Sequence, residues 1–357
     1  KITKKKINIT IELAGEKLKI IDKINWNKKF IDPESEERLH RLSWIIDLIS
    51  NKKISKNKIQ WCESQILDWY NKFFSEINFQ NVKDSKWTPY TVSERISNIY
   101  LFYKLLNINI PESIKLKIEQ ETLFLINNLE YFKTSINNHI INNSRAIYFS
   151  GLILKKKNFL IKAKKIFLLN YKKLISQDGF LREGSSNYQL IFHRWIIELM
   201  YFTKNEDVNF HRLLSNISKK LFIGSNFFLY DEKKIKVVNF GDVSPDFKSE
   251  WINSILSFNG EKKNIECWSN LFTKNKNNKL ILKNHSKLKK NIELFPNSGW
   301  YKIKKFNHKI FFKLSEIEPK NYPGHFHYDQ GHFIYLYKDN EVFSDTGRLN
   351  YLNLNYI

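Results

Sequence analysis

The chain has 357 residues, of which 42% are hydrophobic and 15% aromatic, so it is long enough for two domains and too apolar for a disordered protein. Its formal net charge of +23 predicts an acidic partner, such as nucleic acid, anionic lipid or anionic polysaccharide. Lysine dominates the basic residues and Ile, Asn and Phe are abundant, as AT-rich coding DNA produces, so part of this charge is expected on solvated faces. No apolar run reaches membrane-spanning length, and Cys62 and Cys267 are too few for a disulfide framework.

The first part of the chain predicts a hairpin followed by helices. Residues 6–22 alternate apolar and polar side chains around Ala14-Gly15, which indicates a short β-hairpin. From about Glu36 the apolar residues recur at helical spacing, and Thr91 with Glu94 fits a capping box. Short linkers between these stretches indicate stacked helical hairpins. Amphipathic stretches follow at about 58–77, 92–108, 112–132, 135–154, 158–176, 187–204 and 209–222.

The last part of the chain is β-like. Residues 234–242 read as extended, and the Lys- and Asn-rich stretch 273–290 reads as a domain linker. Beyond Phe295 the sequence predicts strands, with a hairpin turn at 338–341. We therefore expect an α+β multidomain protein: an entry segment at 1–30, a helical domain at 31–285, and the start of an antiparallel β-domain at 290–357, read as truncated because so few strands leave an exposed edge.

The segment His325-x-His327-x-Asp329 precedes the predicted hairpin at 338–341 and holds three side chains that can bind metals or transfer protons. Alternation in an extended segment puts the three side chains on one face, and Asp345 follows on the return strand. A polar surface loop is the alternative for any single histidine. The combination predicts a site built on a sheet.

Three helical motifs are weaker signals. Asn137-Asn138-His139 opens a helix, where asparagine could cap the helix or grip a carboxylate. Residues 182–188, ending in Tyr188, form a turn-rich approach to an apolar helix, so Tyr188 is either a packing residue or presented into a cleft. Arg95 and Asn98 share a helix face and could form a solvated surface or contact a ligand.

In order along the chain, these motifs resemble the heparinase II/III-like polysaccharide lyases, especially members found with bacterial surface-polysaccharide genes. The resemblance covers nearly the whole sequence. The matching pieces are Leu39-His40-Arg41, Trp87 with Arg95-Ile-Ser-Asn98, Asn137-Asn138-His139 with Asn143, Ala146 and Gly151, Glu183-x-Ser185-x-x-Tyr188, Gly241-Asp242, and His325-x-His327-x-Asp329 with Asp345-x-Gly347.

This resemblance implies an incomplete α/α toroid of helical hairpins followed by an antiparallel β-sandwich, with an acidic glycan in the cleft between them. It implies β-elimination at a uronic acid, which needs a neutralised substrate carboxylate, a base for the C5 proton and an acid for the leaving oxygen. By motif match, Asn138 would neutralise the carboxylate, with His139 or Arg95 as a nearby helper. Tyr188 would be the acid and could also be the base, and His325 would be the partner base. Substrate-binding residues would be Arg95, Asn98, Asn137 and Glu183.

In some relatives a structural zinc is implied as well. His327 and Asp345 would be two ligands, and a third would lie beyond Ile357. Gly184 and Gln189 depart from the family pattern, where Gln and His are common, and the second change is expected to lower the rate. The family context implies a periplasmic or secreted location. No signal peptide is visible, but the chain lacks an initiator Met and reads as a fragment.

Two other functions compete with the lyase. One is a surface-polysaccharide biosynthesis or binding factor of the same fold with little lyase activity. The other, from a different class, is a basic helical protein that binds nucleic acid, which requires a continuous stripe of lysines away from the predicted site. The lyase requires Asn138, Tyr188 and His325 to converge.

Overall fold

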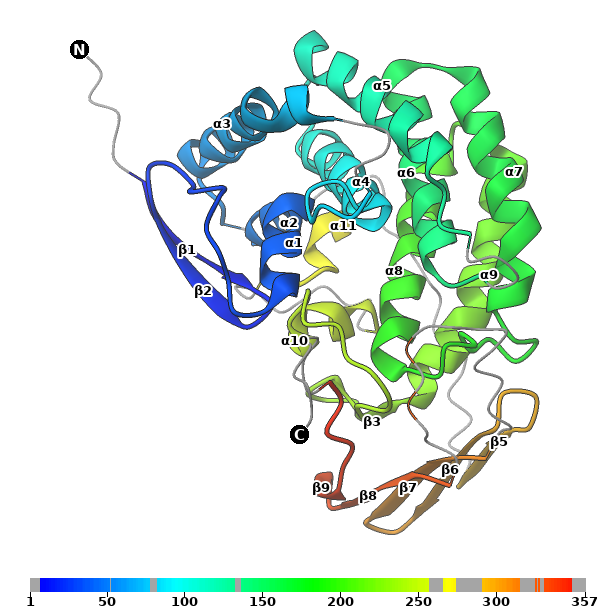
Figure 1. The fold of residues 1–357 in the computed structure, drawn as a ribbon. Coiled ribbons are helices and arrows are strands. Elements are labelled where there is room, and N and C mark those ends of the chain that lie inside the picture. Colours follow the sequence, from blue (N-terminus) through cyan, green and yellow to red (C-terminus); the bar gives the residue numbers. More distant parts are fainter. Residues whose placement is uncertain are drawn as a thin grey trace.

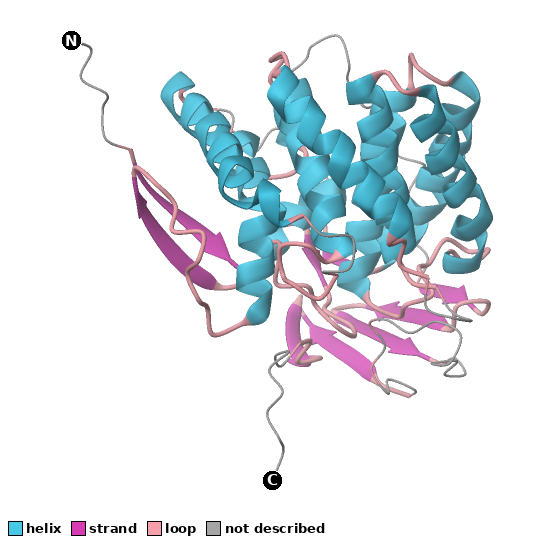
Figure 2. Ribbon diagram, turned by 45° about the horizontal axis from the view of Figure 1, so that its top comes forward, coloured by secondary structure: helices cyan, strands magenta, loops and turns pink. Residues whose placement is uncertain are grey.

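A computed structural model describes residues 7–51, 53–77, 82–131, 136–256, 266–273, 291–314, 325, 327 and 331–348. Helices form the larger part, and a sheet lies against one end of them (Figures 1 and 2). None of the helices in these ranges is long and apolar enough to cross a membrane.

The predicted N-terminal hairpin is confirmed. Strands β1 (Asn8–Leu13) and β2 (Glu16–Ile21) pair antiparallel, and positive φ angles at Ala14 and Gly15 make the tight turn. Ile9, Ile11 and Leu13 point to the core, as alternation requires.

The helices of the main domain fall into two sets by burial. Nearly every side chain of α4, α6 and α8 is buried, whereas α5, α7 and α9 bury one face each. The first set is therefore inner and the second outer. The helix bounds are α1 Pro33–Arg41, α2 Ser43–Ser50, α3 Lys56–Phe73, α4 Pro89–Leu105, α5 Glu112–Asn127, α6 His139–Leu154, α7 Lys157–Leu174, α8 Ser186–Thr203, α9 Val208–Phe227, α10 Ser249–Asn253 and α11 Asn270–Thr273, with 3-10 turns at Phe74–Glu76 and Ser254–Leu256.

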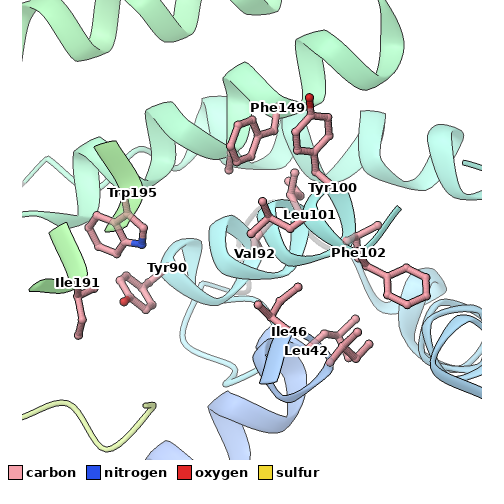
Figure 3. Close-up of a cluster of buried hydrophobic side chains, with 14 of the residues drawn as sticks. Leu42, Ile46, Tyr90, Val92, Tyr100, Leu101, Phe102, Phe149, Ile191 and Trp195 are labelled. Atoms are coloured by element: carbon pink, nitrogen blue, oxygen red, sulfur yellow. The ribbon is translucent and has the colours of Figure 1, made fainter. Parts of the chain in front are cut away.

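Inner helices meet in one large apolar core. Figure 3 shows part of it, where Ile46 of α2, Val92 of α4, Phe149 of α6 and Trp195 of α8 gather around α4. These four side chains are 1% exposed or less, so the core fixes the inner helices relative to one another.

Two local expectations about helix ends were wrong. Helix α4 begins at Pro89 with Thr88 as its N-cap, and the Thr88 side chain accepts from the Thr91 backbone N–H at 3.2 Å. Proline is favoured at the first helical position, so the helix begins at Pro89 and the predicted capping box of Thr91 and Glu94 lies inside it. The stretch after Glu36 is also broken into α1 and α2 at Leu42, whose φ is 57°.

The C-terminal strands form one antiparallel sheet in the order β5-β6-β7-β8-β9, as the β-like sequence predicted. A second sheet facing it, which a sandwich requires, is not found in the described part of the chain. Trp300, Phe311 and Ile334 cover the helical end by packing on Phe227 and Phe240. The strand bounds are β3 Leu229–Asp231, β4 Lys236–Val237, β5 Ile292–Phe295, β6 Trp300–Lys305, β7 His308–Lys313, β8 Phe333–Tyr337 and β9 Asn340–Phe343.

Candidate active site

The candidate site lies where the N-terminal end of α8 meets the connection between β7 and β8. Tyr188 is in the first turn of α8, and Ser185 caps that turn by accepting from the Tyr188 backbone N–H at 3.1 Å. The rings of Tyr188 and His325 lie face to face, with centroids 3.2 Å apart and planes 10° apart. A phenol and an imidazole are thus in direct contact across the two parts of the chain.

Two carboxylates flank the imidazole of His325. Its Nδ1 lies 2.8 Å from Asp242 Oδ2, and its Nε2 lies 3.7 Å from Glu183 Oε2. A hydrogen bond from Nδ1–H to Asp242 fixes the tautomer and leaves the lone pair on Nε2. His325 can therefore accept a proton at Nε2.

A glycine makes this close approach possible. Gly241 has φ +73°, and a Cβ there would lie 2.9 Å from the Gly184 carbonyl and 3.4 Å from the His325 carbonyl. Ser185 Oγ donates to the Asp242 carbonyl, which ties the loop before α8 to the loop after β4. Three distant segments therefore converge on one backbone position that only glycine suits.

Asn138 and Glu183 lie beside this pair and are fully buried. Glu183 accepts a hydrogen bond from the Asn138 backbone N–H, and burial raises the pKa of its carboxyl despite the nearby His325. Among the described residues, Asn138 Oδ1 and Nδ2, Glu183 Oε2 and His325 Nε2 have no hydrogen-bond partner. Buried polar atoms are nearly always paired, so this cluster indicates a place for a polar ligand.

His139 extends the cluster along the start of α6. Its Nδ1 lies 2.9 Å from Glu130 Oε1, its ring contacts Tyr90, and Asn137 accepts from its backbone N–H. Burial opposes the charged form, but the Glu130 carboxylate outweighs it and raises the pKa of His139. The side chain keeps 26% of its surface exposed, so the imidazole reaches solvent.

Arg95 and Asn98 contact other residues of the helical domain, and their predicted role in substrate binding stays a prediction. The Arg95 guanidinium is fully buried, lies 2.7 Å from Glu121 and stacks on Trp69. Asn98 donates to the Arg41 carbonyl. Arg95 and Asn98 do lie on the same helix, α4, as predicted, but both side chains are buried inside the helical domain.

Gln189 and Gly184 also have local roles. Gln189 accepts from the Leu181 backbone N–H and donates to the carbonyls of Gly179 and Leu221, so it braces the loop before α8 and is turned away from Tyr188. Gly184 has φ +71° in that loop. The contact that orients the site comes instead from Asp242, which binds His325. Asp242 belongs to the Gly241-Asp242 motif, for which the sequence predicted no role.

The metal prediction finds little support among the described residues. His325 and His327 lie outside the strands, Asp329 lies outside the described residues, and no group of three His, Cys, Asp or Glu suited to a metal occurs in the described ranges. Asp345 accepts from the backbone N–H groups of Gly241 and Gly347 and lies 3.6 Å from His332 Nε2. One carboxylate and one imidazole fall short of a closed zinc site. Zinc therefore stays a prediction.

Comparisons with known proteins agree with this architecture. Residues 287–355 match the family described as "Heparinase II/III-like, C-terminal". The predicted resemblance to heparinase II/III-like proteins is confirmed. The fold is similar to a crystal structure of heparinase III, with a TM-score of 0.62 and 15% identity over 91% of this chain and 53% of that one. It is also similar to heparan sulfate lyase HepC from Pedobacter heparinus, with a TM-score of 0.52 and 17% identity over 91% and 51%.

The chain thus spans about half the length of the heparinase structures that it matches. No curated protein matches the sequence. At such identity the likeness establishes the fold, and the chemistry must be argued from this chain's own residues.

Proposed function

We propose that this heparinase-like protein is a polysaccharide lyase that cleaves an acidic, uronate-containing glycan by β-elimination. The observation that carries the proposal is the contact of Tyr188 with His325, whose Nδ1 is held by Asp242. The reaction needs one group that takes a proton and one that gives a proton, both within reach of the same sugar ring. A phenol against an oriented imidazole supplies both.

In this mechanism His325 Nε2 takes the proton from C5 of the uronate, and the electron pair forms the C4–C5 double bond. The Tyr188 hydroxyl gives its proton to the C4 oxygen as the glycosidic bond breaks. Asp242 stabilises the imidazolium that forms. Atoms balance without water, because one proton enters the enzyme at His325 and another leaves it at Tyr188.

The C5 proton becomes acidic enough only if the sugar carboxylate is neutralised. The Asn138 amide is buried and unpartnered, so it can donate to that carboxylate. Burial lowers the pKa of His139, but the Glu130 carboxylate raises it on balance, which favours the positively charged imidazole. Burial raises the pKa of Glu183, which favours its neutral carboxyl and so weakens its repulsion of an anion.

The test is the rise of unsaturated-uronate absorbance with heparan sulfate, alginate, hyaluronan and bacterial capsular glycans. Tyr188→Phe keeps the ring and removes the proton, so turnover should fall roughly 10²–10⁴-fold with the fold intact. Tyr100→Phe is the matched control, since Tyr100 is buried against Phe149 in the helical core and should keep full activity.

Equal turnover in Tyr188→Phe and the wild type would assign the proton transfer to another group. Glycan binding without any absorbance change, in wild type and variant alike, would instead support a binding or biosynthesis factor of the same fold.

A further inference from the structure

The outer surface of α7 and α9 differs from the rest of the helical domain. Neither helix contains an aspartate or glutamate. Among neighbouring acidic residues, Asp178 follows α7, Glu206 and Asp207 precede α9, and Glu119 of α5 pairs with Lys156 just before α7. We call the exposed side chains of these two helices the α7–α9 face: Lys157, Asn158, Ile161, Lys162, Lys165, Leu168, Leu169, Lys172 and Lys173 from α7, and Val208, Asn209, Arg212, Asn216, Lys219, Lys220 and Ile223 from α9.

Side chains from the middle of α7 contact the start of α9, so the face continues from one helix to the other. Phe167 of α7 contacts Phe210 of α9, with ring centroids 5.3 Å apart. Lys164 forms an ion pair with Asp207, which caps α9, so that carboxylate already has a cationic partner. Figure 1 shows α7 and α9 next to each other at one edge of the helical domain.

Large aliphatic side chains stand among the lysines. On α7, Ile161 is 59% exposed, and two turns further on Leu168 is 47% and Leu169 59% exposed. Val208 and Ile223 are also at least half exposed on α9. Single exposed apolar residues are ordinary, but five of them on one acid-free basic surface indicate a partner with both anionic and apolar character.

We propose that the α7–α9 face binds the surface of an anionic lipid membrane. Lysine ammonium groups would contact lipid phosphates, while the aliphatic side chains enter the boundary between headgroups and acyl chains. Nucleic acid offers the same negative charge, but its backbone gives leucine and isoleucine nothing to bury against. The aliphatic residues therefore favour lipid over nucleic acid.

The proposed membrane-binding face does not include the residues of the candidate active site. The face belongs to the outer helices, and none of its residues is among those gathered around Tyr188 and His325. Binding there is independent of the proposed lyase activity, so either proposal can fail without the other.

Flotation with vesicles tests the proposal. The protein should float with phosphatidylcholine vesicles that contain a quarter phosphatidylglycerol, and not with phosphatidylcholine alone. Lys165→Gln with Lys172→Gln should weaken partitioning roughly 25-fold, because each lysine near an anionic surface contributes roughly five-fold. The matched charge control is Lys233→Gln with Lys234→Gln, two exposed lysines outside the face, which should bind like wild type.

A second variant separates lipid insertion from charge alone. Leu169→Gln should weaken partitioning roughly five-fold or more, since it removes apolar surface that would enter the bilayer. Ile31→Gln is its control, because Ile31 is 78% exposed and lies before α1, away from the face.

The proposal is overturned if the wild-type protein does not bind anionic vesicles at low ionic strength. It is equally overturned if the variant with Lys165→Gln and Lys172→Gln floats like wild type. It is also overturned if Leu169→Gln binds vesicles normally and double-stranded DNA or heparan sulfate displaces the protein from them at low concentration. That last result would assign the face to polyanions in general.

Discussion

The carboxylate of Glu94 offers the sharpest test of how the inner helices are held. It lies on α4 and accepts hydrogen bonds at 3.0 Å from Arg145 of α6 and from Arg194 and Trp195 of α8. Burial alone would raise its pKa, but the two guanidinium charges outweigh burial and lower the pKa from 4.5 to about 2. The ionised form is therefore favoured by folding.

The lowered pKa of Glu94 determines how much its ionised carboxylate stabilises the folded protein and how this stabilisation changes with pH. At ~1.4 kcal/mol per pH unit, a fall from 4.5 to about 2 stabilises the folded state by about 3 kcal/mol. That contribution is fully present above pH 4.5 and is lost as the pH falls toward 2. Glu94→Gln removes the charge and leaves two buried cations with Glu198, so unfolding at pH 7 should cost about 3 kcal/mol less than in wild type.

Urea unfolding at pH 7 and pH 3 measures the effect. The gap between Glu94→Gln and wild type should narrow at pH 3, because below pH 4.5 Glu94 is protonated in the unfolded chain while it stays largely ionised in the folded protein. Glu250→Gln is the control, since Glu250 is exposed and its removal should change stability by less than about 0.5 kcal/mol. A Glu94→Gln protein as stable as wild type at pH 7 would refute the argument that this carboxylate holds the three helices together.

Two further predictions concern the loops around the site. Asp242→Asn should lower kcat by roughly 10²-fold with little change in KM and should shift the pH profile, because the charge that orients His325 and stabilises its protonated form is lost. Gly179→Ala should destabilise the protein by more than about 2 kcal/mol in urea unfolding, since φ is +94° and a Cβ would meet the Lys220 carbonyl at 2.1 Å. Gly15→Ala, with φ +89° and open space around it, isolates the backbone cost of about 1 kcal/mol.

Periodicity predicted the elements well because most of them bury one continuous face. The hairpin around Gly15 and the long helices followed from the spacing of apolar residues. The break at Leu42 did not, because a left-handed turn at a leucine is imposed by packing of α1 and α2 rather than by local preference.

The site was harder to predict, because burial is a property of the assembled fold. Arg95 has the sequence context of a surface arginine, and only its contact with Glu121 of another helix shows that it is a structural residue. The same limit applies to Asp242. Its contact with His325 depends on a turn at Gly241 that brings two remote segments together, and neither residue type nor spacing states that distance.

Glu183 links the burial of the site to the kind of sugar that it could accept. An ionised carboxylate at this position would repel a uronate and would cancel part of the help that Asn138 gives. Burial raises the pKa of Glu183, although the imidazole of His325, the backbone N–H of Asn138 and the imidazole of His139 act against that rise. A higher pKa favours the neutral carboxyl, which repels an anion less than a carboxylate does. Under the proposed lyase function, the enclosure of Glu183 therefore favours binding of an acidic glycan.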